Sequence, residues 1–385
     1  MKNKIFTNVE SKQEMMESLA WQVHDYAEIS KEEVKSCKLL AESLEKLGFA
    51  VETEVFGMPH SFRAVWKNGE GGPNIGFLGE YDALPGVGHG CGHHLQTPAA
   101  IGAAAALKES LTADTPCTIT VYGTPAEESG GGKVVMMKNG GFKELDVALA
   151  CHICRTETYV GADSMACAGF IVDYIGKRSH AASAPHEGRS ALDAAILSFN
   201  GIEFMREHVK DGSRIHYTMK EGTGATNVVH AAAKVAYTVR SRDNRYLDEL
   251  VDRFHKIVQG ACLMTETEAE IDVRPRYLAR IPNDTIAQVV RANYEAIGED
   301  ILPGLTRGSG GSTDFGNVST IVPAALMYMH FVDVTGHSQE MHDMGKSEEA
   351  KGFLQRAAKA FAGTAYDLIC SPETVKKARE ELNSK

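Results

Sequence analysis

Strand-like and helix-like segments alternate along most of this chain, but the alternation changes between about residues 168 and 280. Four strand-like runs precede that block, at residues 49–56, 74–79, 118–122 and 146–150. Helical patterns at residues 98–111 and 134–139 separate the last three of these runs, which is the order of a layered α/β domain with a largely parallel sheet. The same order resumes after the block, with a strand-like run at 321–327 and a helical pattern at 346–369.

The block itself follows a β-α-β-α-β order that resembles a ferredoxin-like module. Its segments are strands at 170–175, 234–240 and 269–273 and helices at 190–206 and 244–262. A chain of 385 residues is also long for one hydrophobic core, which favours two domains. We therefore predict an α/β domain with a mixed, largely parallel sheet flanked by helices at 1–166 and 282–385. An α+β domain at 167–281 is inserted into it.

The net charge of the chain disfavours some classes of binding partner. The net charge is −11 and the isoelectric point is about 5.8, which disfavours nucleic acid and anionic membranes as ligands. The first ten residues lack the apolar core of a signal peptide, and the apolar stretch Ala99–Leu107 is too short to span a bilayer. The eight cysteines are scattered along the chain. We therefore expect a reduced, cytoplasmic protein.

A glycine-rich loop after the strand-like run at 74–79 carries residue types that bind metal ions. His89, Cys91, His93 and His94 occupy four of six consecutive positions, and the carboxylate of Asp82 precedes them. Thiolate and imidazole are good ligands for zinc and similar divalent ions. A polar loop with satisfied side chains is the simpler explanation for one histidine, but not for this cluster.

Two adjacent carboxylates, Glu127 and Glu128, follow the apolar strand at 118–122. Strand ends are where α/β proteins place their sites. One carboxylate can bind a metal ion while the other carries a proton. An exposed acidic turn is the alternative interpretation of this pair.

Two further stretches offer ligands. Cys151 and Cys154 flank His152, so that this stretch is a redox pair, half of a structural zinc site, or a single histidine ligand between two packing cysteines. No second Cys-x-x-Cys completes a zinc site, and we favour the histidine because a buried free cysteine behaves as a small hydrophobic residue. Near the C-terminus, one of His330, His337 and His342 could complete a metal shell, and Gly336 gives the backbone freedom at His337.

Taken together, these segments resemble the M20 metallopeptidase and amidohydrolase family, in particular its aminobenzoyl-glutamate hydrolase and aminoacylase-like branch. The resemblance extends from Met15 to about Leu368. The motifs that carry it are Glu80–Pro85, Gly90–His93, Thr124–Glu128, Ser179–Ala182 with Pro185, and Gly311–Asp314.

The resemblance implies a catalytic domain that holds two divalent ions. The implied ligands are Cys91, which binds or bridges the ions, and His93, Glu128, His152 and His337. Glu127 is implied as the general base. Asp82 is implied as a residue that supports the site from behind the ligands. His94 stands where this branch usually has Asp or Asn, so His94 competes for a metal ion in this interpretation, and His330 competes with His337 for the last position.

The resemblance further implies that the inserted domain is a lid that also forms a homodimer. His180 is implied as the lid histidine that reaches the substrate across the dimer, and Asn227 and Arg240 as residues that hold a substrate carboxylate. The 310–313 loop, with Ser312 and Thr313, is implied to line the pocket. Singly, each of these residues is more often an ordinary surface residue.

The expected function is hydrolysis of an amide bond in a small substrate with a free carboxylate, by a metal-activated water. N-acyl amino acids, aminobenzoyl-glutamate-like amides and dipeptides all fit. Zinc or manganese is the expected metal, with cobalt as an alternative. The competing hypotheses are a thiol redox protein that uses Cys151 and Cys154, and a non-catalytic protein that kept the fold.

Overall fold

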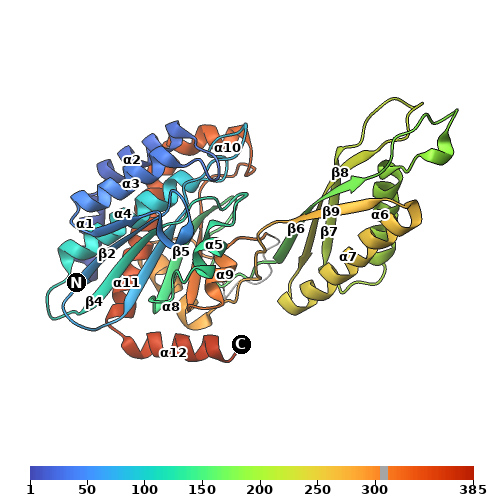
Figure 1. Ribbon diagram of the computed structural model, residues 1–385. Coiled ribbons are helices and arrows are strands. Elements are labelled where there is room, and N and C mark those ends of the chain that lie inside the picture. The colour runs from blue at the N-terminus through green and yellow to red at the C-terminus, as the bar shows by residue number, and fades with distance from the viewer. Residues whose placement is uncertain (304–310) are drawn as a thin grey trace. The chain divides into compact units, whose positions relative to one another are not determined.

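The computed structural model describes residues 1–303 and 311–385, which form two compact units (Figure 1). Among the described residues, the larger unit comprises Met1–Asp163, 280–303 and Thr313–Lys385, and the smaller unit comprises Ser164–Ala279 and 311–312. Within the described residues, no helix is both long and apolar enough to cross a membrane.

The larger unit is built on a six-stranded sheet in the order β1-β2-β4-β3-β5-β10. Its strands are β1 (Ala50–Thr53), β2 (Phe62–Asn68), β3 (Asn74–Gly79), β4 (Cys117–Gly123), β5 (Val147–Cys154) and β10 (Ala324–His330). The four strands β4, β3, β5 and β10 are parallel, and β1 and β2 add an antiparallel edge. The parallel strands are almost fully buried, as expected for strands covered on both faces.

Helices cover both faces of this sheet. One face packs against a large core formed with α1 (Lys2–Glu10), α2 (Gln13–Tyr26), α3 (Val34–Lys46), α4 (His93–Ser110), α8 (Asp284–Ala296), α11 (Glu348–Ile369) and α12 (Pro372–Asn383). The other face packs against η1 (Val55–Gly57), α5 (Gly132–Lys138) and α9 (Phe315–Ser319). The short helices α10 (Gln339–Asp343) and η3 (Met344–Lys346) precede α11. Residues on α4 are buried almost all round, because α2 and α11 pack on the side that faces away from the sheet.

The smaller unit is a four-stranded antiparallel sheet, order β7-β8-β6-β9, covered on one face by two helices. Its elements are β6 (Ala166–Ile175), η2 (Pro185–Glu187), α6 (Ala191–Arg206), β7 (Arg214–Glu221), β8 (Ala232–Ser241), α7 (Asn244–Thr265) and β9 (Glu268–Val273). Side-chain caps begin both long helices: Ser190 accepts from the Asp193 amide, and Asp243 from the Tyr246 amide. The expected fold class, an α/β unit with a ferredoxin-like α+β unit, is confirmed.

Several elements differ from the sequence prediction, which did not include α1, β2 or α8. The charged edge strand β7 was not predicted, and it completes a β-α-β-β-α-β order in the smaller unit. Helix α4 begins at His93 and not at Pro98, so that His93 and His94 are helical and the loop ends at Gly92. Pro98 lies inside this helix, where it lacks the N–H for one backbone hydrogen bond.

Candidate metal centre

The carboxyl ends of the parallel strands bring the predicted site residues to one edge of the larger sheet. Glu80 and Asp82 follow β3, Glu127 and Glu128 follow β4, and His152 lies near the end of β5. Because parallel strands end at the same edge, segments more than 70 positions apart in the chain converge there.

The first group of potential ligands is Cys91, His93 and His152, whose ligand atoms all lie within 4.8 Å of one another. The Nε2 atom of His152 is 3.4 Å from the Cys91 sulfur. The Nδ1 atom of His93 is 2.9 Å from Oδ1 of Asp82, and that of His152 is 2.7 Å from the Ile153 carbonyl oxygen. In the neutral form of each ring, these oxygens accept from Nδ1, which leaves Nε2 with a lone pair for a metal ion.

The second group is Cys91, Glu128 and His337, again with ligand atoms within 4.8 Å. The Nε2 atom of His337 is 3.7 Å from Oε1 of Glu128. His337 adopts a left-handed φ of 59°, and its amide donates to the Gly90 carbonyl at 2.8 Å, which anchors its exposed loop beside Cys91. Both groups therefore share the Cys91 sulfur, an arrangement that suits two neighbouring ions.

Two potential ligand atoms in these groups are buried without a hydrogen bond, and one of them, Nε2 of His93, lies 3.2 Å from Oε2 of Glu80. Nε2 of His93 and Oε1 of Glu128 are buried and make no hydrogen bond to any described residue, although buried polar atoms are normally satisfied. Burial lowers the pKa of His93, but the neighbouring Cys91 and Glu80 outweigh burial and raise that pKa well above its usual value. One sulfur, several imidazole nitrogens and a carboxylate match the ligand preferences of zinc and related divalent ions, so these residues fit such ions.

Asp82 makes hydrogen bonds to one potential ligand in each group, His93 and Glu128. Its Oδ1 accepts from His93, and its Oδ2 accepts from the Glu128 amide at 2.9 Å and from the Ser30 hydroxyl at 2.7 Å. Burial alone would raise the pKa of Asp82, but these hydrogen bonds and the charge of His93 lower it to about 2. Asp82 thus fixes the orientation of one potential ligand through its side chain and of another through its backbone.

Glu127 lies between the potential ligands and a buried ammonium group. Its carboxylate is within 4.8 Å of ligand atoms of His93 and Glu128, and also of carboxylate oxygens of Glu80 and Asp314. Burial, followed by the charges of Glu80 and Asp314, raises the pKa of Glu127 well above its usual value. Such a carboxylate is better matched to proton transfer near neutral pH.

The Glu80–Asp314 carboxylates already have a cation, which is the side chain of Lys133. Its Nζ atom is 2.6 Å from Oε1 of Glu80 and 2.7 Å from Oδ1 of Asp314, and none of the three side chains is appreciably exposed. The Lys133 amide also donates to Oδ2 of Asp314 at 2.9 Å. Sequence reasoning assigned no role to any of these three residues. The available signal was a lysine directly before an apolar helical segment.

The other histidines named from the sequence lie apart from the two ligand groups. His94 donates from Nε2 to the Gly345 carbonyl at 2.8 Å and packs against the rings of His24 and His89. His342 accepts from the His89 amide at 3.0 Å. His330 is exposed and lines a separate cavity of about 480 Å³. The geometry therefore favours His337 as the C-terminal member of the site.

The cysteines around His152 do not face each other. Cys151 is fully buried in the large core on the same side of β5 as Ile153, whereas alternation along the strand directs Cys154 to the opposite side with His152. All eight cysteines lie within the described residues, and all are free thiols. This arrangement does not support the redox pair.

In the smaller unit, two hydrogen bonds hold His180 next to Asn227. The Ala181 amide donates to the Asn227 carbonyl at 2.9 Å, and the Val229 amide donates to the Ser179 carbonyl at 3.0 Å. Nδ1 of His180 accepts from the amides of the two residues that follow Ala181. In neutral His180 the proton is therefore on Nε2, which makes the exposed end of the ring a hydrogen-bond donor.

Arg240 lies at the other end of β8, far from Asn227. Its guanidinium donates to the Ser312 hydroxyl at 2.8 Å, and no carboxylate among the described residues pairs with it. Strand β8 has ten residues, which corresponds to roughly 30 Å. One smaller unit therefore cannot present Asn227 and Arg240 to the same small carboxylate. Thr313 belongs to the larger unit, where its hydroxyl accepts from the Phe315 amide at the start of α9.

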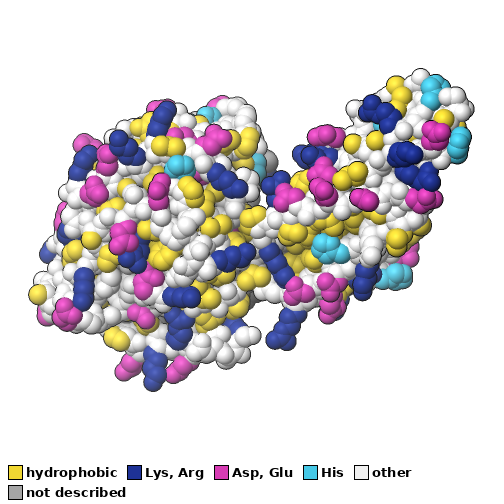
Figure 2. Space-filling view, viewed as in Figure 1, with side chains coloured by type: hydrophobic (Ala, Val, Ile, Leu, Met, Phe, Trp, Pro, Cys, Tyr) yellow, Lys and Arg dark blue, Asp and Glu magenta, His cyan; other side chains and the backbone are white. Residues whose placement is uncertain are grey.

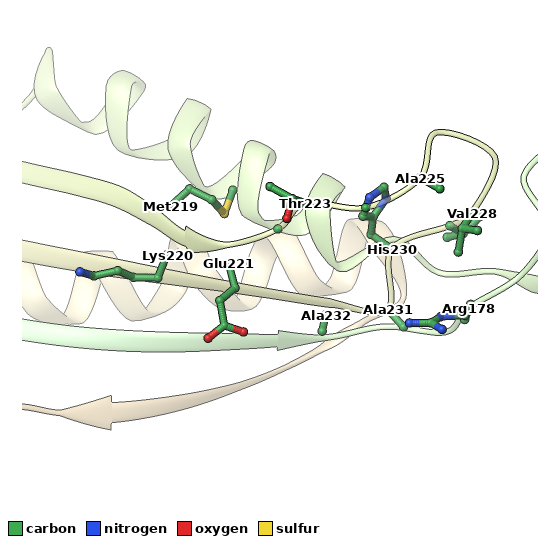
Figure 3. A pocket seen from close by; sticks show the side chains of 13 residues that line it. Arg178, Met219, Lys220, Glu221, Thr223, Ala225, Val228, His230, Ala231 and Ala232 are labelled. Atoms are coloured by element: carbon green, nitrogen blue, oxygen red, sulfur yellow. The ribbon is translucent and has the colours of Figure 1, made fainter.

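A cavity of about 800 Å³ lies in the smaller unit, beside the loop that carries Asn227 (Figure 3). Arg178, Lys220 and His230 are the basic residues on its wall. Figure 3 shows Lys220 extended along its strand, away from Arg178, so these charges do not converge. As far as the chain is described, the wall includes no residue predicted to bind metal or substrate.

Comparisons with known proteins agree with this geometry. Residues 74–367 match the model of peptidase family M20/M25/M40. The chain is 35% identical over 342 residues to the Xaa-Arg dipeptidase of Mus musculus, covering 86% of this chain and 79% of that protein. It is 36% identical over 308 residues to one component of the p-aminobenzoyl-glutamate hydrolase of Escherichia coli (strain K12), covering 75% of this chain and 63% of that protein.

A solved structure shows the same fold at low identity. It is a dinuclear metal binding peptidase of the M20 family from Bacillus subtilis, with a TM-score of 0.64, 18% identity, and coverage of 91% of this chain and 98% of that one. Together with the family match over 294 residues (74 to 367) of the 385, these similarities establish the relationship. The chain belongs to peptidase family M20/M25/M40 and is a hydrolase of that family.

Proposed function

We propose that the chain is a metal-dependent amidohydrolase that cleaves the amide bond of a small substrate with a free carboxylate. The observation that carries this proposal is the pair of ligand groups that share Cys91 beside the Glu127–Glu128 pair. The names of two relatives, a dipeptidase and an aminobenzoyl-glutamate hydrolase, support a small amide substrate.

In this proposal Cys91, His93 and His152 hold one divalent ion, and Cys91, Glu128 and His337 hold the other. Zinc or manganese suits these ligands, and cobalt is an alternative. When bound, the ions supply a water of lowered pKa and polarise the substrate carbonyl. The similarity to the dinuclear metal binding peptidase of Bacillus subtilis supports two ions.

Glu127 is proposed as the general base. Its carboxylate takes a proton from the attacking water and then gives it to the nitrogen of the leaving amine. Its position next to His93 and Glu128 supports this role, and its raised pKa favours temporary storage of the proton. Asp82 keeps His93 and Glu128 in place during the reaction.

Two groups of the smaller unit are proposed to act on the substrate. The Nε2–H donor of His180, oriented by the two amides at Nδ1, would stabilise the oxyanion of the tetrahedral intermediate. Arg240, with Ser312 beside it, would bind the substrate carboxylate. Asn227 and Thr313 would line the substrate pocket.

The separation along β8 supports a site that uses two copies of the chain. His180 and Asn227 are at one end of the strand and Arg240 is at the other, so a second copy would contribute the His180 end. Apolar side chains on α6 and α7 are exposed, among them Phe204 at 70% and Leu263 at 73%. Figure 2 shows hydrophobic side chains gathered in a band on this unit. Burial of such a surface would stabilise a homodimer through the lid.

The proposed function is tested by metal analysis together with hydrolysis of a panel of N-acyl amino acids, aminobenzoyl-glutamate and dipeptides. We expect two divalent ions per chain and hydrolysis of at least one substrate class. Glu127→Gln should retain both ions and lose turnover, because the amide cannot accept the proton. Full turnover by this variant would exclude Glu127 as the base.

The two-copy site is tested with heterodimers of His180→Ala and Glu127→Gln, each chain carrying a different affinity tag. If His180 acts on the site of the other copy, one of the two sites has both residues intact and the heterodimer is active, although each homodimer is inactive. An inactive heterodimer would place both residues in the same chain's site.

A further inference from the structure

Glu33 is a buried carboxyl group outside the proposed chemistry. It lies between α2 and α3, immediately before α3 begins, and is 0% exposed. Its Oε1 atom accepts a hydrogen bond of 2.7 Å from the backbone amide of Ala126, 93 positions along the chain. Its Oε2 atom is buried and has no hydrogen-bond partner among the described residues. A carboxyl group is costly to bury, so a contact of this kind needs an explanation.

The residue that Glu33 contacts has an unusual backbone. Ala126 has a φ of +60°, a left-handed conformation that residues with a Cβ atom rarely adopt. Ala126 stands directly before the Glu127–Glu128 pair, at the point where the chain leaves β4. The backbone conformation of Ala126 therefore sets the direction in which the side chains of Glu127 and Glu128 leave the chain.

Both sides of Ala126 are held. The N–H group of Ala126 donates a hydrogen bond to Glu33. On the carbonyl side the oxygen accepts from the Gly130 amide at 3.0 Å and from the Gly132 amide at 3.3 Å. The carbonyl bonds are local to the loop, whereas the bond to Glu33 ties the Ala126 peptide itself to another part of the chain.

The surroundings favour Glu33 in its neutral form. Burial, and then the charge of Asp82, raises the pKa of Glu33 to about 8. A neutral carboxyl group can accept from the Ala126 amide without adding a further negative charge next to the Glu127–Glu128 pair.

We propose that Glu33 is a positioning residue that acts through the Ala126 peptide and holds the Glu127–Glu128 turn in its working conformation. This inference rests on the proposed role of Glu127. Asp82 accepts from the Glu128 amide independently, so loss of Glu33 mainly releases Glu127. The expected effect is therefore on the chemical step more than on binding of substrate or metal.

The test compares Glu33→Ala, Glu33→Gln and a matched control, Glu28→Ala. Glu28 lies on the same segment, where its carboxylate accepts from the amides of Lys35 and Ser36 at the start of α3. Each variant is measured for kcat, KM, bound metal, thermal stability and hydrogen exchange at the Ala126 amide.

Glu33→Ala should lower kcat by about 10- to 100-fold, the size expected when a reacting group is misplaced by about 1 Å. Its KM should change by less than about 3-fold, with both ions retained and faster exchange at Ala126. Glu33→Gln keeps an acceptor oxygen and should restore most of kcat. Glu28→Ala should lower the melting temperature and leave kcat close to that of the unmodified chain.

Unchanged exchange at Ala126 in Glu33→Ala would overturn the inference, because it would show that the contact does not hold this peptide. Equal losses of kcat in Glu33→Ala and Glu28→Ala would also overturn it. These outcomes are distinct from failure of the proposed function, which an inactive substrate panel or an active Glu127→Gln would reveal without any change at the Ala126 amide.

Discussion

Replacement of Lys133 by methionine should destabilise the larger unit strongly, and more so at alkaline pH. Methionine keeps the length of the side chain and removes the charge. The ammonium group that it removes lies 2.6 Å from Glu80 and 2.7 Å from Asp314, with all three side chains buried. Loss of one partner from a buried ion pair costs about 3–5 kcal/mol, because the remaining charge stays buried without compensation.

The pH dependence of this destabilisation follows from the pKa values of Lys133 and of the carboxyl groups beside it. The charges of Asp314 and Glu80 raise the pKa of Lys133 above its ordinary value despite burial. A raised pKa of a basic group means that its stabilising contribution is fully present below about pH 10.5 and is lost above that. At pH 8 the unmodified chain therefore has the full stabilising contribution of the Lys133 charge. Burial already raises the pKa of Asp314 to about 6, with Lys133 opposing that rise.

Without Lys133 the two carboxyl groups should bind protons at still higher pH. The destabilisation should therefore be largest at pH 8 and shrink toward pH 5, where proton uptake removes the unpaired charge. Each pKa unit gained by a carboxyl group corresponds to about 1.4 kcal/mol.

Urea unfolding followed by tryptophan fluorescence measures the free energy of unfolding of the larger unit. The two tryptophans of the chain, Trp21 and Trp66, both lie in the larger unit. Lys359→Met is the matched control, because Lys359 forms a surface pair with Glu10 and such pairs contribute about 0–1 kcal/mol. Equal effects of the two substitutions at pH 8, or a Lys133→Met effect that grows toward pH 5, would refute the reasoning.

Two further predictions concern Arg240 and Glu33. Arg240→Ala should lower kcat/KM about 10- to 100-fold, because a hydrogen bond to a charged group contributes about 1.5–3 kcal/mol. Substrates whose carboxylate is replaced by a carboxamide should show little of this loss, and equal losses for both substrate types would contradict carboxylate binding. The pKa of Glu33 is raised to about 8, so its stabilising contribution is present below about pH 4.5 and is lost as pH rises through about 8. The unmodified chain should therefore lose stability relative to Glu33→Gln between pH 5 and 8 in urea titrations, and a constant difference would show that Glu33 is ionised throughout.

Much of the fold could be predicted from local pattern. Helix α11 spans Glu348–Ile369, close to the predicted 346–369, because its apolar residues repeat at helical spacing and Ser347 caps its start. Strand β7 was missed although Ile215, Tyr217 and Met219 alternate with polar residues. Its polar positions carry Arg, His and Lys, which are typical of an exposed edge strand and weaken the strand signal.

The candidate site was predictable where ligand types cluster in the sequence. Cys91 and His93 are two positions apart, and Glu127 and Glu128 are adjacent, so the chemistry is visible before the fold is known. Glu33 and Lys133 were not predictable in this way. The chain has 51 acidic residues, and only tertiary packing determines which of them become buried against an amide or an ammonium group.

The burial of α4 has a consequence for how metal would leave the protein. His93 is the first residue of a helix whose side chains are buried on almost every side, so release of this imidazole requires a buried segment to open. His337, by contrast, is 58% exposed at its side chain and sits on a surface loop. Two ions bound as proposed should therefore exchange with solvent at very different rates, and a chelator should remove the one near His337 first while the protein stays folded.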